Sequence, residues 1–498
     1  MLPPLIQRSR RSTRWSRERG ATMAIVAISL VAIIAMAALS IDVGTLYEAK
    51  AEAQRAADAA ALAAARTISM QGLTGDPTNA SSSWQLICGG EGSPASLAAN
   101  NVAQQNLIGG AAASKVKVYY GTSGGVGTIE DCSTVGAAFG VNPVVQVYVQ
   151  QATLPNFFAR VFSLVVSGGT SNSGVSATAT AEVFNPSNSN AYASSGDVVP
   201  VQPRCVKPWI VPNYDPYQGS CNTTNCFPFV STANGALGRP GIRVLTSGVI
   251  GEQFWLLADC GAGATCTLLS PPEANYGGAH LPPNLQYLPG LTSSPSVAVP
   301  SDGSSACSAV AGDGIFAQAI AGCDQSTQYQ CGVQSSSLSN PNQVNLAENP
   351  VTTDTTDGVE CLIHQTTVDL SQLEGQDALL PTGGAFGSLP PNYPFQIEVG
   401  TSNPLVGAGA AGVITSSNSI VSLPIYDSTA VTTFGPGTTT PVTIIGFLQV
   451  FINVVDASGN MNVTVMNVSG CGNGTTPVSS PLNGTSPVPI RLITPPSP

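Results

Sequence analysis

The chain has 498 residues, which is enough for two or three domains with their own hydrophobic cores. Only 9% of the residues are charged, and Gly, Ser, Thr, Asn and Pro are abundant, which favours short strands joined by turns. The net charge is -11 although six of the seventeen basic residues precede residue 20, so the rest of the chain is strongly acidic. An acidic surface repels phosphate backbones, which excludes nucleic-acid binding by the main body.

A basic leader (residues 1–20) precedes an apolar segment. The arginines of the leader are Arg8, Arg10, Arg11, Arg14, Arg17 and Arg19. The segment from Ala21 to Ile41 carries no charge, and as a helix it would measure about 31 Å, which matches the hydrocarbon core of a bilayer. Basic flanks stay in the cytoplasm, so we expect a single span in the inner membrane with the N-terminus inside and the bulk of the chain periplasmic or extracellular.

Two targeting signals offer other interpretations of this segment. Ala35-Met36-Ala37 resembles the small-residue site of a cleaved signal peptide, but the apolar segment is longer than a usual signal core and its helical pattern continues beyond that site. Ser9-Arg10-Arg11 begins like a twin-arginine signal, and the residues that follow do not continue the motif. The membrane span is therefore the preferred interpretation.

An Ala-rich helix is predicted over residues 42–70, because Thr45 to Ser69 contains good helix formers and no proline. Small and apolar residues recur along it at spacings of three and four: Leu46, Ala49, Ala53, Ala57, Ala60, Ala64 and Ile68. This smooth face allows close approach of another element. Either the helix lies on the chain's own β-rich module or it packs against other subunits.

The N-terminal motifs resemble a known family. Glu18-Arg19-Gly20-Ala21 precedes the span, Ile41-Asp42-Val43-Gly44-Thr45-Leu46-Tyr47 follows it, and an alanine-rich stretch extends from Gln54 to Ala65. This pattern resembles the TadG-like N-terminal region of Flp (tight adherence) pilus-assembly proteins over about residues 17–68. A looser similarity includes Phe157–Phe162 and Val175–Ala181.

The resemblance implies a membrane-anchored accessory component of a pilus or secretion system, with pilus or secretion subunits as partners and no catalytic site. Pseudopilin-type relatives carry glutamate five residues after the leader glycine, and here that position is Ile25. Longer relatives carry a von Willebrand A module with a metal-binding Asp-x-Ser-x-Ser loop. The nearest candidate here, Asp302-Gly303-Ser304-Ser305-Ala306, ends in alanine.

Residues 71–184 are predicted to form a small mixed α/β module. Its elements are a helix at Ser93–Gln105, capped by Ser93 or Ser96, and strands at Lys115–Tyr120, Val144–Val149 and Val175–Phe184. A linker rich in Ser, Asn and Pro follows at residues 185–203.

A larger β-rich module is predicted over residues 204–476, with a frayed tail at 477–498. Val442–Val455 and Met461–Val468 flank a turn and predict a β-hairpin, and Ile414–Ile425 predicts another strand. The turn-rich sequence at the start of this module gives no helical pattern.

Twelve cysteines, all after the span, indicate an oxidising compartment and disulfide bonds, although spacing alone does not fix which cysteines pair. The candidate disulfide cysteines are Cys88, Cys132, Cys221, Cys226, Cys260, Cys266, Cys307 and Cys323. Cys221 and Cys226 could instead begin a zinc site, but no second pair with ligand spacing accompanies them.

Three further motifs fit known sites only in part. Gly121–Gly125 matches a hydrolase nucleophile elbow and Gly407–Gly412 a dinucleotide fingerprint, but neither precedes a helical pattern, so both are predicted to be loops. Asp354, Asp357 and Glu360, beside Cys361 and His364, have the residue types of a cation site, although Asp357-Gly358 first indicates a turn. We therefore expect no catalytic, cofactor or metal site.

The sequence predicts a membrane-anchored α+β protein in which one transmembrane helix continues into an Ala-rich helix, a small mixed module and a larger, disulfide-braced β-rich module. The preferred function is that of an accessory or structural component of a Flp/Tad-type pilus assembly or secretion system. The alternative is a cell-surface adhesin or binding protein with the same anchor, and an envelope hydrolase comes third.

Overall fold

The structure is a computed structural model, and all statements about it concern the part of the chain that it describes. That part comprises residues 15–71, 81–122, 125–136, 139, 143–154, 173–183, 200–201, 206–216, 227–232, 237–239, 241–243, 248–258, 283–290, 299, 304–322, 329–330, 342–346, 352–367, 375–380, 395–407, 412–414, 417–431, 434–435, 437–470 and 490–493.

The chain divides into two compact units, which are described separately. The first comprises Met1–Ala57, Ala103–Val116 and Tyr148–Thr178, and the second comprises Asp58–Val102, Lys117–Val147 and Ala179–Pro498. The long N-terminal helix and three strands of the first sheet contribute residues to both units.

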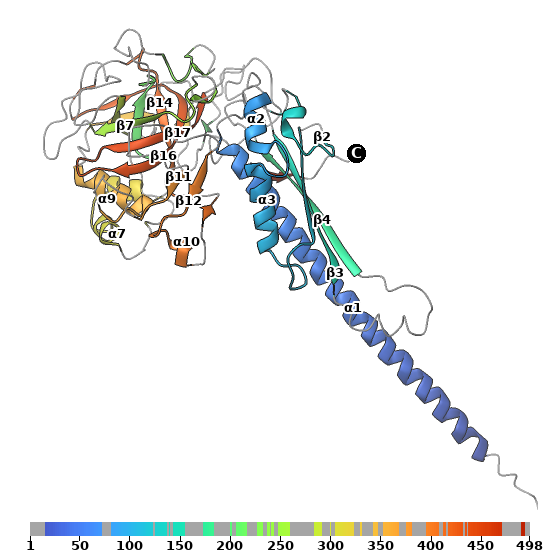
Figure 1. Ribbon diagram of the computed structural model, residues 1–498. Helices are drawn as coiled ribbons and strands as arrows, with labels where there is room; N and C mark the ends of the chain where they lie inside the picture. Colours follow the sequence, from blue (N-terminus) through green and yellow to red (C-terminus); the bar gives the residue numbers. More distant parts are fainter. Residues whose placement is uncertain are drawn as a thin grey trace, which may run out of the picture. The chain divides into compact units, whose positions relative to one another are not determined.

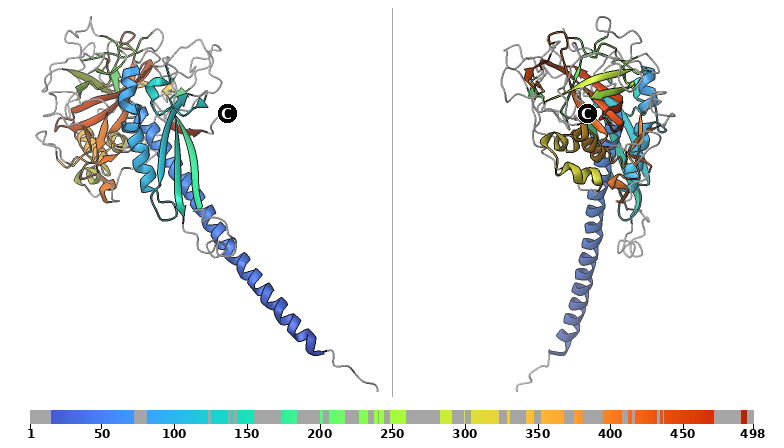
Figure 2. Two further views of the ribbon diagram at one scale, coloured as in Figure 1. Left: turned by 45° about the vertical axis from the view of Figure 1, so that its right-hand side comes forward. Right: turned by 90° about the vertical axis from the view of Figure 1, so that its left-hand side faces the viewer.

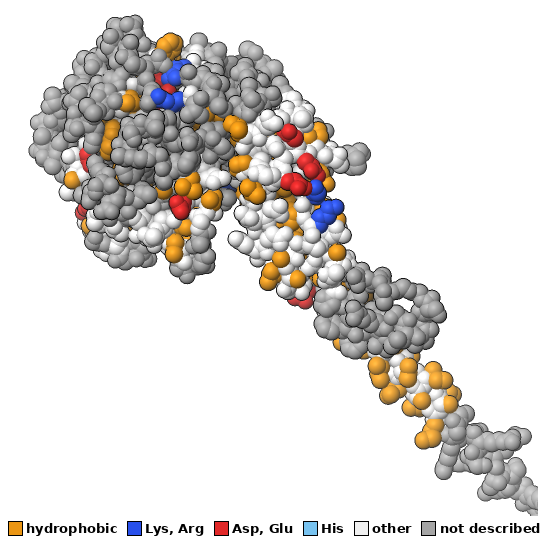
Figure 3. Space-filling model, in the orientation of Figure 1, with side chains coloured by type: hydrophobic (Ala, Val, Ile, Leu, Met, Phe, Trp, Pro, Cys, Tyr) orange, Lys and Arg blue, Asp and Glu red, His pale blue; other side chains and the backbone are white. Residues whose placement is uncertain are grey.

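Helix α1 (Trp15–Ser69) has no proline and many alanines, so it continues unbroken over 55 residues (Figure 2). The prediction of one helix through the span and the Ala-rich segment is confirmed. From Met23 to Ile41 its large apolar side chains are exposed, between 52% and 78%, and they form an apolar surface along the helix (Figure 3). α1 is long and apolar enough to cross a membrane.

A five-stranded sheet has the strand order β18-β4-β3-β1-β2. Its elements, with the helices near them in the sequence, are α2 (Ser81–Cys88), α3 (Pro94–Gln105), β1 (Lys115–Thr122), β2 (Gly125–Val126), the 3₁₀-helix η1 (Cys132–Thr134), β3 (Val144–Leu154), β4 (Ser173–Val183) and β18 (Ile490–Ile493). The predicted helix and three predicted strands of this region are present. The predicted frayed tail is wrong for residues 490–493, which pair antiparallel with β4.

The second unit contains a closed barrel with the strand order β14-β16-β17-β7-β8-β6 (Figure 1). Its strands are β6 (Trp209–Pro212), β7 (Gln253–Ala258), β8 (Asn284–Pro289), β14 (Ile420–Tyr426), β16 (Ile444–Val455) and β17 (Met461–Gly470). The hairpin β16–β17 confirms the predicted pairing around the turn at residues 456–460. The core side chains include Phe254, Leu285 and Val463.

Shorter strands and a short helix complete the second unit. They are β5 (Pro200–Val201), β9 (Tyr329–Gln330), β10 (Gln343–Asn345), β11 (Ala378–Leu380), β12 (Gln396–Glu398), α10 (Pro404–Gly407), β13 (Val413–Ile414) and β15 (Thr439–Pro441). The strand predicted over Ile414–Ile425 is confirmed from Ile420 onward as β14, but its continuity is wrong, because Ile414 belongs to β13, which pairs with β12 and not with the barrel.

The second unit also contains three helices that the sequence pattern did not predict: α7 (Ser305–Val310), α8 (Ile315–Ala321) and α9 (Thr352–Ile363). The turn predicted at Asp357-Gly358 is wrong, since both residues lie inside α9. A Cβ atom on Gly358 would come within 2.9 Å of Ile320, so this glycine permits close packing of α9 on α8. Ile320 and Val359 are part of the barrel's core cluster.

Candidate functional site

Two hydroxyl side chains, one at the end of the apolar segment and one just beyond it, bond to carbonyls of α1 itself. The hydroxyl of Ser40 donates to the carbonyl of Met36 at 2.8 Å, and that of Thr45 donates to the carbonyl of Asp42 at 2.9 Å. Such bonds within one helix supply the partner that lipid cannot offer. The segment therefore suits a hydrocarbon environment, in agreement with the exposure of its apolar side chains.

Beyond the span, two side chains of α1 hold strand β4. The Lys50 Nζ donates to the carbonyl of Ser176, and the Gln54 Nε2 donates to the carbonyl of Thr178 at 3.3 Å. Four residues of helix rise about 6 Å and two residues of strand about 6.6 Å, so side chains spaced i, i+4 match carbonyls spaced i, i+2. The two bonds therefore fix the register of helix against strand.

The two bonded carbonyls lie on the side of β4 that faces away from β3, outside the stretch of β4 that pairs with β18. The amide of Val183 donates to the carbonyl of Pro143, next to β3, so odd-numbered backbone groups of β4 face β3 and even-numbered groups face away from it. Ser176 and Thr178 are even-numbered. Lys50 and Gln54 thus cover edge carbonyls that could otherwise pair with another chain.

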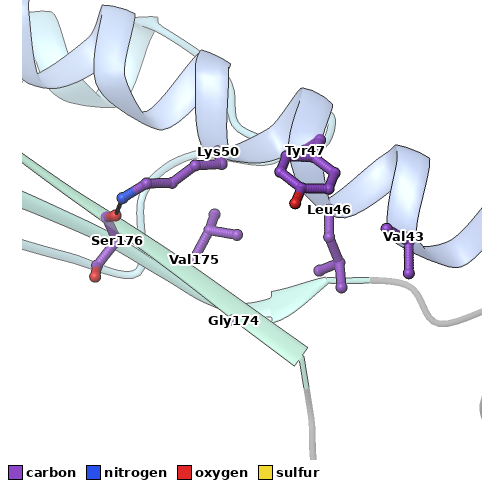
Figure 4. Close-up of a pocket in the computed structure, with 7 residues that line it drawn as sticks. All are labelled: Val43, Leu46, Tyr47, Lys50, Gly174, Val175 and Ser176. Carbon is purple, nitrogen blue, oxygen red and sulfur yellow. Dashed lines mark hydrogen bonds between the residues drawn. The ribbon is translucent and has the colours of Figure 1, made fainter.

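A pocket of about 430 Å³ lies beside the Lys50 bond (Figure 4). Its lining residues come from the segment of α1 just past the span and from the start of β4: Val43, Leu46, Tyr47, Lys50, Gly174, Val175 and Ser176. The side chain of Tyr47 is 74% exposed and that of Val43 is 40% exposed. The pocket therefore combines apolar walls with the Lys50 cation and the Tyr47 hydroxyl (Figure 4).

A second pocket, of about 270 Å³, has the opposite charge. Glu48 and Glu52 line it together with the turn at Gly109 and Gly110 and the end of β3 at Leu154. The Glu52 carboxylate accepts from the amide of Gly109 at 2.7 Å. Both glycines have positive φ, and a Cβ on Gly109 would lie 2.5 Å from Leu154, so this turn requires glycine.

The C-terminal end of α1 is tied to the β-rich part of the second unit. The Gln71 side chain, which is fully buried, donates to the carbonyl of Phe395 at 3.2 Å and accepts from the amide of the same residue at 2.9 Å. Met70 belongs to the barrel's core cluster. Ala60 and Ala64 of the small-residue face are also fully buried, so the structure favours the interpretation that this helix packs within its own chain.

Two disulfides brace the second unit. One joins Cys88 at the end of α2 to Cys132 in η1. The other joins Cys307 in α7 to Cys361 in α9. From the sequence we expected Cys361 beside the polar cluster of Asp354, Asp357 and Glu360, and not in a disulfide. The remaining candidate cysteines lie outside the described residues: Cys221, Cys226, Cys260, Cys266 and Cys323.

The weaker motifs occupy structural positions. Gly121 and Gly125 belong to the paired strands β1 and β2, and Ser304 caps α7 by accepting from the amide of Cys307. Gly407 ends the short helix α10 and is followed by β13 where the structure resumes. None of these described segments has the strand-to-helix turn that a nucleophile elbow or a dinucleotide site requires.

The carboxylates of α9 do not assemble into a metal site. No group of three metal-ligating side chains occurs in the described part of the chain. Cys361 is bonded to Cys307, and His364 lies near Asn418 at 3.3 Å. Burial, followed by the nearby charge of Asp357, raises the pKa of Glu360 to about 7.

Sequence reasoning missed a buried ionic network in the second unit. The Arg239 guanidinium donates to Asp215 at 2.5 Å and to Glu252 at 2.8 Å, and both carboxylates are almost fully buried. Burial, with the neighbouring charge of Asp215, outweighs Arg239 and raises the pKa of Glu252 to about 9. Arg239 is 24 positions from Asp215 and 13 positions from Glu252, and no motif connects them in the sequence. Only the rarity of charged residues in the chain could have drawn attention to them.

A buried lysine was missed as well. Lys207 is 1% exposed, and its Nζ donates to the carbonyls of Ile320 and Gly322, each at 2.6 Å. These carbonyls lie at the C-terminal end of α8, where a cation is favoured by the helix dipole and by unpaired acceptors. Lys207 therefore anchors α8.

Comparison with known proteins adds one finding about the N-terminal region. Residues 20–67 match the family model described as "Putative Flp pilus-assembly TadE/G-like". No curated protein and no solved structure gives a significant match to the chain. The match covers the membrane span and the Ala-rich half of α1, the segment on which the sequence resemblance rests. The N-terminal region of the chain is therefore similar to the TadE/G-like Flp pilus-assembly family, and it contains a helix long and apolar enough to cross a membrane.

Proposed function

We propose that this chain is a non-enzymatic accessory or structural subunit of a Flp/Tad-type pilus assembly or secretion system. It is held in the inner membrane by α1, with residues 1–20 in the cytoplasm and the sheet and barrel on the other side. The family match over residues 20–67 supports the pilus role. The arginines that precede the span support the orientation, and the disulfides Cys88–Cys132 and Cys307–Cys361 support an oxidising compartment for the bulk.

The observation that carries this proposal is the continuity of α1. The helix extends without a break from the span to Ser69, and Gln71 directly after it is bonded to Phe395 by both atoms of its amide. The same helix thus contains the apolar segment and ends at residues that are packed in the second unit. A subunit that joins a membrane apparatus to an outer module needs such a connection.

The orientation is tested by protease treatment of spheroplasts that contain the full chain. We expect protease to degrade the bulk of the chain and to leave a short N-terminal fragment that carries the span. In intact cells the bulk should survive if it is periplasmic, and a cytoplasmic protein serves as the control for lysis. Protection of the bulk in spheroplasts, together with its labelling from the cytosol, would contradict the proposed topology.

The role in pilus assembly is tested by affinity purification of the tagged full chain from membranes in which a Flp/Tad system is expressed. We expect components of that system to co-purify, and the Gln71→Ala variant to assemble less well because α1 loses its attachment. Exposed Gln105 offers a matched control, since Gln105→Ala should have no effect. If the Gln71→Ala variant assembles as well as the wild type, partner binding does not depend on the attachment of α1 through Gln71.

A cell-surface adhesin is the second candidate, because the barrel lies outside the family match. Binding of the full chain to glycans or cell surfaces, without co-purification of pilus components, would favour this candidate. Co-purification without such binding would favour the pilus subunit.

A further inference from the structure

The connection between β3 and β4 is much longer than these strands require. Val183 bonds to Pro143, and a Cβ atom on Gly174 would come within 3.2 Å of the Cα atom of Ala152, so the strands are antiparallel and the start of β4 lies beside the end of β3. Two to five residues are enough to join such strands. The connection, residues 155–172, has 18 residues and lies outside the described part of the chain, so most of it is not needed to close the turn.

This segment leaves and rejoins the described chain beside the two pockets on α1. Leu154, the last residue of β3, lines the pocket of about 270 Å³, and Gly174 lines the pocket of about 430 Å³. Leu46 of α1 lines both, so the two pockets adjoin on one side of the helix. Residues 155–172 therefore begin at one pocket and end at the other.

The sequence of residues 157–164 has an apolar pattern that requires a surface to cover it. Phe157, Val161 and Leu164 recur at spacings of four and three, which would place them on one side of a helix. Arg160 directly precedes Val161, lies at the edge of that side, and is the only charged residue of the connection. The pattern thus predicts an apolar ridge with one cation beside it.

The larger pocket offers an apolar surface to such a ridge. Val43, Leu46 and Val175 supply its apolar walls. The first two point from α1 toward the side on which β4 begins, which is where the connection rejoins the described chain (Figure 4). Val43 is 40% exposed, so part of this wall is still open to a further contact.

The smaller pocket offers the opposite charge. The described residues that line it include Glu48 and Glu52 and no cation. Glu52 accepts from the amide of Gly109, whereas Glu48 is exposed. Six residues, or about 20 Å of fully extended chain, lead from Leu154 in the pocket wall to Arg160. The guanidinium of Arg160 can therefore reach the Glu48 carboxylate.

We propose that residues 157–164 of the same chain dock on α1 in these two pockets, with their apolar side against the walls of the larger pocket and the Arg160 guanidinium paired with Glu48. The linkage to both strands favours this occupant over a second copy, because a linked segment acts at an effective concentration in the millimolar range. The docked segment holds the β3–β4 end of the sheet on α1 just past the apolar segment. This inference is independent of any role in pilus assembly.

The experiment uses the full chain reconstituted in phosphatidylcholine vesicles, with p-benzoylphenylalanine in place of Tyr47, which lines the larger pocket and is 74% exposed. Irradiation should cross-link this position to residues 155–166, identified by mass spectrometry of the peptides. A mixture of unlabelled and isotope-labelled chains distinguishes the sources, because cross-links within one chain join only peptides with the same labelling.

Charge reversal in this photoreactive chain tests the ion pair. Arg160→Glu should lower the cross-linking yield about fivefold, the upper end for one exposed ion pair. The double variant Arg160→Glu, Glu48→Arg should restore the yield, which a variant that had merely lost its fold would not do. Exposed Arg55 of α1 is the matched control, and Arg55→Glu should leave the yield unchanged.

A second pair of variants tests the apolar contact. Val161→Asp should also lower the yield, whereas Ser163→Asp, on the opposite side of the predicted helix, should not. Equal yields from the Arg160→Glu, Arg55→Glu and parent chains would overturn the proposal. A loss that the double variant does not restore would overturn it too, as would cross-links to lipid, between chains, or only to parts of the same chain outside residues 155–172.

Discussion

Charged residues are few in this chain, and two of the cations bind buried acceptors, which are backbone carbonyls for Lys207 and carboxylates for Arg239. Lys207 binds the last carbonyls of α8, and Arg239 binds two buried carboxylates. The partners of Lys207 are more than 110 positions away in the sequence, and those of Arg239 are 13 and 24 positions away. Composition could therefore show that such residues are rare, but it could not show where they bind.

Lys207→Ala is expected to destabilise the protein by about 3 kcal/mol. The substitution removes the donor from two carbonyls at the end of α8 and leaves a cavity in a buried site. The free energy of unfolding in urea measures the loss. Exposed Lys115 is the matched control, because Lys115→Ala should change this free energy by less than about 0.5 kcal/mol. A similar loss in both variants would contradict the buried contact.

Glu252 gives the stability of the protein a defined pH dependence. Its pKa is raised from 4.5 to about 9, so between these values the folded state holds a proton that the unfolded state has released. This group's contribution is fully present below about pH 4.5 and is lost as the pH rises to 9, by at most about 1.4 kcal/mol per pH unit.

Glu252→Gln should remove this dependence, because the amide stays neutral. The variant should gain stability relative to the wild type, and the gain should be larger at pH 8 than at pH 5. Urea unfolding at the two pH values measures the difference. A gain that shrinks as the pH rises would show that Glu252 is ionised in the folded state.

At the scale of elements, long or strongly patterned segments could be predicted from sequence and short packed helices could not. α1 and the hairpin β16–β17 have clear periodicity, and the structure contains both. α7, α8 and α9 have 6, 7 and 12 residues. α8 and α9 pack on the barrel core and α7 packs on α8 and α9, so tertiary packing rather than their own propensity stabilises them. Gly358 illustrates the ambiguity, because a glycine that permits helix packing has the same sequence signature as a turn.

Gln71→Ala should loosen the end of α1 without unfolding the barrel. Two buried backbone groups of Phe395 lose their partner, which costs about 2–3 kcal/mol. Amide hydrogen exchange should accelerate over residues 58–69 and at Phe395, while the strands β16 and β17 keep their protection. Faster exchange throughout the barrel would instead show that α1 is required for its folding.

Removal of residues 490–498 should expose the edge of β4. Strand β18 pairs with Thr180–Val183, so its loss leaves a row of unpaired backbone groups. We expect concentration-dependent association of the detergent-solubilised chain, measured by light scattering. Removal of residues 494–498 alone, which retains β18, is the matched control. Equal association of the two truncated chains would exclude the edge of β4 as the cause.

At the scale of the whole molecule, the apolar span and the family resemblance could be predicted from the sequence, but the pocket beside Lys50 could not. The span and the resemblance of residues 17–68 were readable because they are local patterns. The pocket beside Lys50 requires α1 and β4 to meet, although about 120 residues separate them, and spacing in sequence gives no information about such a contact. The pairing of Cys307 with Cys361 was unpredictable for the same reason.

Loss of the Cys88–Cys132 disulfide should lower the free energy of unfolding by about 4 kcal/mol, the entropy estimate for a closed loop of 44 residues. The double variant Cys88→Ala, Cys132→Ala is compared with the wild type by urea unfolding under oxidising conditions. With reductant present the difference between the two proteins should disappear. A difference that persists in reductant would indicate a packing defect at these positions instead.

The contact between β18 and β4 also determines when the first sheet can be completed during synthesis of the chain. β4 ends at Val183, and its partner strand is made only after about 300 further residues. At 5–20 residues per second, the ribosome needs roughly 15–60 s to supply it. Throughout that interval the nascent β4 lacks this partner strand, and a chaperone that binds unpaired strand edges would find its substrate there.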